Sequence, residues 1–338
     1  MLESAEGAVP GESVASGESA LGACRVLAIA GSGRSGSTIV ELVLAQHDKV
    51  VATGELVWLW DRGLVENQLC GCGTPLQQCP FWTAVLETAY GSVGAAPVAE
   101  VLRLRTLVQR RRQVPDHLEW LHRPSFQDAL ARYRAILQPL YAAVAQCSGK
   151  DLVVDSSKLP YYLFVLAGTP DVDLRVLHLL RDARATCFSW SQTKARPEIH
   201  WSQESMPRFG LLAACGMWMT DNAGSELLGR RSPRAVIRYE DLAAEPRPAL
   251  AAIGELAGLE LDPAELLHRA AEASRPRVAH TVSGNPVRFG QGPLVIRPDL
   301  RWQAQLSRPA RTVATLVTWP MLRRYGYLGG PGGPATPR

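Results

Sequence analysis

CRVLAIA (Cys24–Ala30), GSGRSGST (Gly31–Thr38) and IVELVLA (Ile39–Ala45) follow one another directly, and together they decide the fold. The first stretch is short and largely apolar, the second is rich in glycine and serine, and the third places apolar residues at helical spacing. The sequence therefore predicts a strand, a tight turn and a helix. A strand of this kind is typical of the centre of a parallel sheet that is covered on both faces.

Further strands are predicted along the chain, each followed by a helical stretch. They are Leu152–Asp155, Leu174–Leu180 and Ala235–Tyr239, and one more is expected just before Gly54. Alternating strands and helices are typical of α/β proteins. We therefore predict an α/β fold: a P-loop-type, doubly wound parallel sheet flanked by helices.

The segment between Phe81 and Gly149 has a mainly helical pattern that is interrupted by prolines. We interpret residues 83–150 as a helical insertion over the carboxyl edge of the sheet, where α/β proteins bind their ligands. Residues 23–327 are expected to form one domain. Residues 1–22 and 328–338 are predicted to be disordered tails.

Composition excludes several classes of protein. The 36 Lys and Arg residues exceed the 32 Asp and Glu residues by only four, which does not indicate a nucleic-acid partner. A chain with 46% hydrophobic residues is not wholly disordered. Its longest apolar runs are about ten residues, whereas a membrane span needs about 20. Without an export signal, we expect a cytoplasmic protein with reduced cysteines.

The glycine-rich turn nearly fits the Walker pattern G-x-x-x-x-G-K-[ST]. Gly31, Gly36 and Thr38 match the pattern, but Ser37 stands where the lysine is expected, and Arg34 is the only cation of the turn. Backbone N–H groups at a helix N-terminus still form an anion cradle, to which serine and threonine hydroxyls would add donors. Without the lysine, transfer of an ATP phosphate is not favoured. The alternative interpretation is a turn with no ligand.

A second candidate anion site follows the predicted strand Leu174–Leu180. Arg181 ends this strand, Asp182 is a candidate N-cap for the next helix, and Ser189 comes about two turns later. Arg181 and Ser189 can therefore face one phosphate at the carboxyl edge of the sheet. A solvated basic turn with a capping aspartate is the alternative.

These two sites together resemble the sulfotransferase superfamily that uses 3′-phosphoadenosine 5′-phosphosulfate (PAPS). R-S-G-S-T at Arg34–Thr38 is similar to the family's 5′-phosphosulfate loop, and Arg181 with Ser189 is similar to its 3′-phosphate site. Other stretches resemble bacterial members in the same order along the chain. They are TGEL (Thr53–Leu56), VVDSSK (Val153–Lys158), W-x-x-x-N (Trp218–Asn222), RYEDL (Arg238–Leu242) and GNPVRF (Gly284–Phe289). Each motif alone is weak, whereas the ordered set is specific.

The resemblance implies roles for individual residues. Arg34 would lie at the leaving 5′-phosphate, and Lys158 would approach the sulfuryl group. Arg288 would close on the nucleotide from the long loop before Asp299. The implied donor-binding positions are Gly33, Arg34, Ser35, Gly36, Ser37, Thr38, Arg181, Ser189 and Arg288.

The acceptor hydroxyl needs a general base, and the resemblance implies Glu55, which follows Gly54 at the expected strand end. The alternative is that Glu55 is a surface residue in a turn. His200 and His280 are rival bases, because the cytosolic small-molecule branch of the superfamily uses histidine. A carboxylate acts as a base at neutral pH only if its pKa is raised or if proton transfer is late.

The implied reaction is in-line transfer of the sulfuryl group from PAPS to a hydroxyl of a small-molecule, glycan or lipid-linked acceptor, with residues 83–150 contributing to acceptor binding. No metal and no nucleic-acid partner are expected. Two alternatives are a P-loop nucleotide kinase or hydrolase, which would need Mg²⁺, and a non-catalytic nucleotide-binding protein.

Two further features leave alternatives open. Cys70, Cys72 and Cys79 could bind zinc with His47 or another cysteine as the fourth ligand, but paired C-x-x-C spacing is absent, and a disulfide or plain packing is the alternative. A basic stretch on a predicted helix suits an amphiphilic acceptor or a membrane surface, or it is a solvated helix face. Its arginines are Arg103, Arg105, Arg110, Arg111 and Arg112.

Overall fold

The structure is a computed structural model, and it describes residues 22–109, 113–272, 279–290 and 292–328. All but the innermost residue of each predicted disordered tail, 1–22 and 328–338, lie outside the described residues. Three of the arginines in the basic stretch, Arg110, Arg111 and Arg112, also lie outside them.

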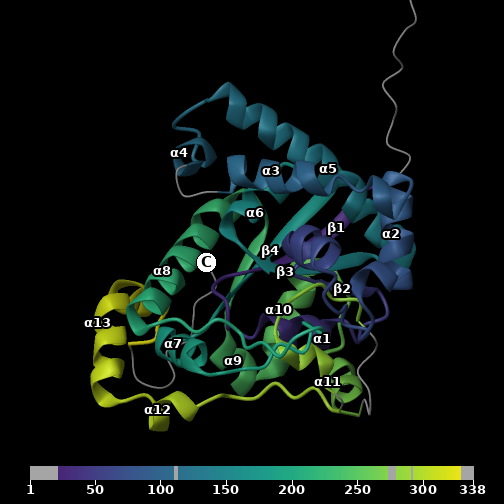
Figure 1. Ribbon diagram of the computed structural model, residues 1–338. Coiled ribbons are helices and arrows are strands. Elements are labelled where there is room, and N and C mark those ends of the chain that lie inside the picture. Colours follow the sequence, from purple (N-terminus) through teal and green to yellow (C-terminus); the bar gives the residue numbers. More distant parts are fainter. Residues whose placement is uncertain (1–21, 110–112, 273–278, 291, 329–338) are drawn as a thin grey trace, which may run out of the picture.

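A five-stranded parallel sheet forms the centre of the molecule, with the order β2-β3-β1-β4-β5 (Figure 1). Its strands are β1 (Cys24–Ala30), β2 (Val50–Gly54), β3 (Leu152–Lys158), β4 (Val172–Leu180) and β5 (Arg234–Arg238). The predicted fold class is therefore confirmed. β3 continues three residues beyond its predicted end, so the VVDSSK motif lies wholly within a strand.

Helices cover both faces of the sheet, and the central strand shows why. Alternate residues of a strand point to opposite faces. Val26 and Ala28 of β1 pack in one hydrophobic cluster, whereas Leu27 and Ile29 pack in another. Both faces are apolar because both are buried, as the sequence of β1 predicts.

Two groups of helices fill these clusters (Figure 1). The first cluster contains α2, α3, α5 and α6, and the second contains α1, α9, α10 and α11. The helices are α1 (Ser37–Leu44), α2 (Pro80–Tyr90), α3 (Val98–Val108), α4 (Val114–His117), α5 (Pro124–Ser148), α6 (Pro160–Leu166), α7 (Ala183–Ser191), α8 (Leu211–Leu228), α9 (Tyr239–Ala244), α10 (Pro246–Ala257), α11 (Pro263–Glu272), α12 (Arg301–Gln305) and α13 (Arg308–Arg324).

Residues 83–150 do form helices, and part of this segment packs on a face of the sheet. Tyr133, Leu137 and Tyr141 of α5 are fully buried in the cluster that contains Val26 and Ala28 of β1. These helices therefore cover a face of the sheet. Proline spacing and helical periodicity predict that helices form, but not against which surface of the sheet they pack.

The last helix, α13, packs against α7 and α8, which follow β4 along the chain (Figure 1). Ala314 of α13 and Ala214 and Cys215 of α8 are fully buried together. These helices support the strand end that carries Arg181. Within the described ranges, no helix combines the length and the apolar character that a membrane crossing requires.

Candidate functional site

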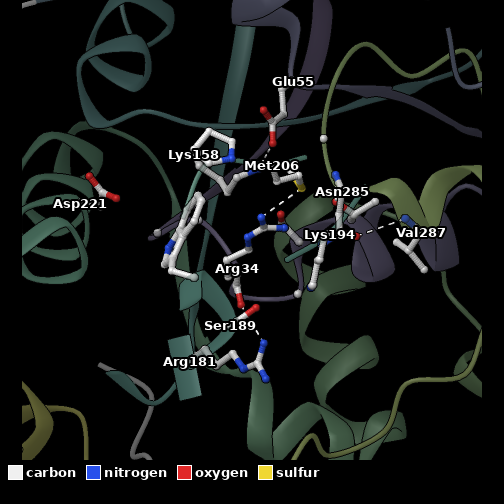
Figure 2. A pocket seen from close by; sticks show the side chains of 18 of the residues that line it. Arg34, Glu55, Lys158, Arg181, Ser189, Lys194, Met206, Asp221, Asn285 and Val287 are labelled. Carbon is white, nitrogen blue, oxygen red and sulfur yellow. Dashed lines mark hydrogen bonds and ion pairs between the residues drawn. The ribbon is translucent and has the colours of Figure 1, made fainter. Parts of the chain in front are cut away.

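A cavity of about 560 Å³ opens where β1, β3 and β4 end (Figure 2). Its walls come from the glycine-rich turn, from the ends of β3 and β4, from α7 and from residues 284–287. Six cationic side chains and three carboxylates line it. The cations are Arg34, Arg62, Lys158, Arg181, Lys194 and Arg196. A cavity of this size and charge suits an anionic small molecule.

The glycine-rich turn has the backbone of an anion-binding loop. Gly36 has a φ of 95° and directly precedes α1, and Arg34 also adopts a positive φ of 70°. A side chain at position 36 would collide with the ring of Tyr239, since a Cβ there would lie 2.5 Å from it. Glycine is therefore required at this position, and the N-terminus of α1 faces the cavity through Ser37 and Thr38.

Arg34 holds a partly buried charge without a carboxylate ion-pair partner among the described residues. Its Nη2 lies 3.0 Å from Sδ of Met206, and its guanidinium lies over the ring of Trp190 at 4.5 Å. Its Nε is buried and makes no hydrogen bond within the described part of the chain. Burial lowers the pKa of Arg34, an effect that the charge of Glu55 partly offsets. A partly buried cation of this kind is stabilised by an anion in the cavity.

Glu55 and Lys158 form an ion pair in the same cavity, with Nζ of Lys158 2.6 Å from Oε1 of Glu55. Both side chains are largely buried, at 14% and 11% exposure. Lys158 has a positive φ of 65° and also donates to the carbonyl of Ser156. Figure 2 shows Arg34 between this pair and Arg181. The ends of β2 and β3 therefore bring a carboxylate and an ammonium beside the anion loop.

Glu41, which the sequence analysis missed, lies beneath this pair. It is fully buried on α1 and accepts hydrogen bonds from the N–H of Gly54 at 2.5 Å and from Oγ of Ser156 at 2.7 Å. Burial raises the pKa of Glu41 to about 7, although its hydrogen bonds act in the opposite direction. Glu41 therefore joins the loop helix to both strand ends. A single glutamate among the apolar residues of this helix is the feature of the sequence that could have indicated a buried carboxylate.

The second predicted anion site is next to the first. Arg181 donates to the carbonyl of Arg34 at 2.9 Å and pairs with Asp299 at 3.1 Å. Ser189 lines the same cavity from α7, and Asp182 caps α7 by accepting from the N–H of Arg184. The two anion sites predicted from the sequence thus share one cavity.

Lys194 is a further cation of the cavity that the sequence analysis missed. It follows α7, and burial lowers its pKa to about 8, with the charges of Arg34 and Arg181 acting in the same direction. Its lowered pKa thus reflects burial first and, to a smaller extent, the positive charges at this end of the sheet. A lysine in a loop gives no periodic signal, so sequence patterns alone do not reveal it.

The tryptophan and asparagine of the W-x-x-x-N motif support the site without lining the cavity, whereas Asp221 between them lines it. Nε1 of Trp218 donates to the carbonyl of Arg181 at 2.8 Å, and Oδ1 of Asn222 lies 3.0 Å from Nε2 of His178. Ser225, one turn further along α8, accepts from the N–H of Gly31 at 3.1 Å. α8 therefore holds both the β4 end and the start of the anion loop.

Four of the predicted candidates do not reach the cavity. Ser35 is buried, and its hydroxyl has no partner among the described residues. Arg288 is also buried. Its guanidinium donates hydrogen bonds to the carbonyls of Thr281 and Leu69 and does not point into the cavity. His200 is exposed beside the carbonyl of Asn67, and His280 lies among the cysteines. Arg288 therefore holds two loops together, and neither histidine faces Glu55.

The helical insertion reaches the cavity only indirectly. None of its described residues lines the cavity. Arg105 of α3 lies over the ring of Trp58, which lines the cavity, and pairs with Asp61 at 3.3 Å. Arg103 is exposed and pairs with Glu100. Of these two arginines of α3, Arg103 therefore forms an exposed ion pair, and Arg105 supports Trp58 from behind the cavity wall.

A strand, a glycine-rich turn and a helix at the centre of a parallel sheet, with helices on both faces, define an α/β protein. Within that class, the chain belongs to the family of sulfotransferase domains, because the family's sequence profile matches residues 26–278. The family predicted from the ordered motifs is confirmed. No curated protein sequence matches the chain significantly.

A solved sulfotransferase domain is similar to this chain in fold, and two further structures give lower scores. The domain of the olefin synthase from Synechococcus PCC 7002 has a TM-score of 0.50 and 20% identity, over 91% of this chain and 96% of that one. The domain from the curacin biosynthetic pathway gives 0.49 and 16%, over 90% and 98% of the two chains. A sulfotransferase from Mycobacterium avium gives 0.42 and 13%, over 90% and 77%.

Proposed function

We propose that this protein transfers the sulfuryl group of PAPS to a hydroxyl group of an acceptor. The observation that carries the proposal is Arg34, whose partly buried guanidinium has a sulfur atom and an aromatic ring as partners. The N-terminus of α1 and the cation of Lys158 lie in the same cavity. This arrangement is complementary to an anion on which negative charge increases during the reaction.

The residues divide the chemistry as follows. Glu55 takes the proton of the acceptor hydroxyl, whose oxygen attacks the sulfur. The bond between the sulfur and the bridging oxygen of the 5′-phosphate breaks, and its electron pair leaves with that phosphate. Arg34 and the loop N–H groups stabilise this charge. Lys158 lies 2.6 Å from Glu55, so it can hold the sulfuryl oxygens beside the base.

The 3′-phosphate would bind at Arg181 and Ser189, with Lys194 as a third donor. Arg181 would keep its hydrogen bond to the carbonyl of Arg34. Its guanidinium, which is paired with Asp299, would bind the phosphate either in place of Asp299 or together with it. Both phosphates of one nucleotide would thus be held by a single wall of the cavity. Selection of PAPS over ATP depends on this second anion site.

Two alternatives remain distinguishable by experiment. A P-loop kinase would use a lysine at the position of Ser37 and would need Mg²⁺. A binding protein without activity would not need the carboxylate of Glu55 beside Arg34 and Lys158. The activity that we propose should therefore not rise when Mg²⁺ is added. The acceptor class (small molecule, glycan or lipid-linked metabolite) and the cytoplasmic location stay predictions.

The test incubates the purified chain with PAPS and a metabolite extract of the producing organism. Mass spectrometry then searches for metabolites that gain one SO₃ group while 3′-phosphoadenosine 5′-phosphate accumulates. Arg34→Ala is the inactive control, and Arg208→Ala, an exposed arginine outside the cavity, is the matched active one. The proposal is contradicted if ATP serves as donor where PAPS does not.

A further inference from the structure

Four side chains with metal-binding atoms meet beside the site but outside the cavity. They are Cys70, Cys72, Cys79 and His280, and their ligand atoms all lie within 4.8 Å of one another. Cys70 and Cys79 are buried, and Cys72 and His280 are partly buried. The three cysteines come from one loop, whereas the histidine comes from a segment about 200 residues further along the chain.

The distances match four-coordinate zinc. Zn–S bonds of about 2.3 Å in a tetrahedron place two sulfur atoms roughly 3.8 Å apart. The sulfur atoms of Cys72 and Cys79 are 3.7 Å apart. Nδ1 of His280 lies 3.2 Å from the sulfur of Cys79 and 4.0 Å from that of Cys70. Three thiolates and one imidazole form a closed ligand set that is typical of structural zinc.

The backbone brings the cysteine loop and the histidine together without the metal. The N–H of Gly71 donates to the carbonyl of Thr281 at 2.9 Å, and a Cβ on Gly71 would lie 2.3 Å from the carbonyl oxygen of Ala279. Only glycine permits this approach. Nε1 of Trp82 donates to the carbonyl of His280 at 2.9 Å. The ring of His280 is also stacked on Phe81, with the ring centroids 4.9 Å apart.

We propose that Cys70, Cys72, Cys79 and His280 bind one structural zinc ion. The sequence analysis named His47 or another cysteine as the fourth ligand, but the histidine of the cluster is His280. His47 instead accepts a hydrogen bond from the N–H of Lys49, outside the cluster. The C-x-C spacing alone did not reveal the site, because its fourth ligand is distant in sequence.

The zinc ion would fix one wall of the cavity. Two residues after His280, Val282 donates to the carbonyl of Thr53 and accepts from the N–H of Glu55, each at 2.7 Å. Asn285, which lines the cavity, donates its N–H to Oγ1 of Thr38. The metal would thus tie the cysteine loop to the segment that contacts both Glu55 and the anion loop. Its role is to position this segment, and no step of the transfer uses it.

The test measures metal in the native protein. The chain is produced with zinc supplied, desalted into metal-free buffer and analysed by elemental analysis and native mass spectrometry. About one zinc ion per chain is expected. Cys72→Ser, Cys79→Ser and His280→Ala should each lose it. Cys147→Ser, which changes a partly buried cysteine outside the cluster, should keep it.

A second measurement on the wild type does not depend on whether the variants fold. Cobalt(II) should replace zinc and give the visible bands of a tetrahedral thiolate site. Three additional thiols should become reactive when a strong chelator removes the metal, and the melting temperature should fall. A wild type without zinc, zinc retained by all three ligand variants, or a disulfide between Cys72 and Cys79 in the native mass would each overturn the proposal.

Discussion

Arg34 is a partly buried cation of the cavity, and its side-chain partners are Met206 and Trp190. Its left-handed backbone and the partial burial of its charge each have an energetic cost, whereas its contact with the ring of Trp190 is favourable. An anion bound in the cavity would stabilise this charge further. The same geometry explains why arginine replaces the Walker lysine. A fixed, permanently charged fork suits a phosphate that leaves with an extra electron pair.

Removing this cation should slow the transfer step. Arg34→Ala is expected to lower kcat by on the order of 10²–10³, as loss of one such stabilising group commonly does. Arg34→Lys should recover part of the rate, because it keeps the charge without the fork. Steady-state kinetics with PAPS checks this, with Arg208→Ala as the unaffected control. Near-normal turnover of Arg34→Ala would exclude the loop as the leaving-group site.

Glu55 should be needed for the reaction but not for nucleotide binding. Glu55→Gln keeps the shape of the side chain and a hydrogen-bond acceptor for Lys158, but it cannot take a proton. Loss of a general base commonly costs about 10²–10⁴ in rate. The nucleotide should still raise the melting temperature of Glu55→Gln, while kcat should fall by this factor. If nucleotide binding is lost instead, Glu55 is a donor-side or structural residue, and normal kcat would show that another group is the base.

Lys194 should make nucleotide affinity depend on pH. Burial lowers its pKa to about 8, so the ammonium that attracts the nucleotide is present below this pH and is lost as the pH rises through it. The Kd of 3′-phosphoadenosine 5′-phosphate, measured by calorimetry, should rise by up to about tenfold per pH unit above that value. Lys194→Arg keeps its charge and should flatten the profile. Identical profiles for both proteins would refute this role.

At the scale of elements, the turn after β2 depends on a close backbone contact. Gly54 has a φ of 76°, and a Cβ there would lie 2.3 Å from the carbonyl oxygen of Val282. Gly91 is the matched control, because its φ is 85° but nothing described lies within 4 Å of such a Cβ. Both alanine variants bear the left-handed strain of roughly 1–2 kcal/mol.

Gly54→Ala must in addition displace the segment that follows His280. We therefore expect its free energy of unfolding to fall by about 1–3 kcal/mol more than that of Gly91→Ala, which is the range for overpacking. Denaturant titration of the two variants and the wild type measures the difference. Equal losses would mean that the contact between the two segments contributes nothing to stability.

The sequence predicted those elements whose signals are local. β1 matched its predicted bounds because an apolar run, a glycine-rich turn and a helix follow one another directly. Arg34, Glu55, Lys158 and Arg181 come together because parallel strands end at one edge of the sheet. The predictions that were wrong concern residues whose partners are distant in the sequence. Arg288 meets Leu69, and His280 meets the cysteine loop, and neither pairing leaves a periodic trace in the sequence.

The insertion shows a second limit at the same scale. The amphipathic pattern of α5 correctly implies one buried face, but the pattern is the same whether a helix covers the sheet or its edge. Only the packing of Tyr133 and Leu137 against residues of β1 decides between them.

For the whole molecule, the sheet, the helices on both faces and α8 with α13 converge on one cationic cavity. In the proposed function, this cavity has two separate phosphate sites, one at Arg34 and the α1 N-terminus and one at Arg181 and Ser189. ADP and 3′-phosphoadenosine 5′-phosphate each carry two phosphates, but only the latter has one at the 3′ position. The pair therefore matches the number of phosphates and differs in the position of the second one. Because 3′-phosphoadenosine 5′-phosphate also carries about one more negative charge near neutral pH, the claim is tested by the difference between the nucleotides together with its loss in Arg181→Ala.

The most direct measurement is a thermal melt of the wild-type protein with each of these two nucleotides at equal concentration. A ligand at about 100 times its Kd adds roughly 2.7 kcal/mol of stability. The account predicts a clearly larger rise in melting temperature with 3′-phosphoadenosine 5′-phosphate than with ADP, and loss of this difference in Arg181→Ala. Equal rises for the wild type, or a larger rise with ADP, would contradict it.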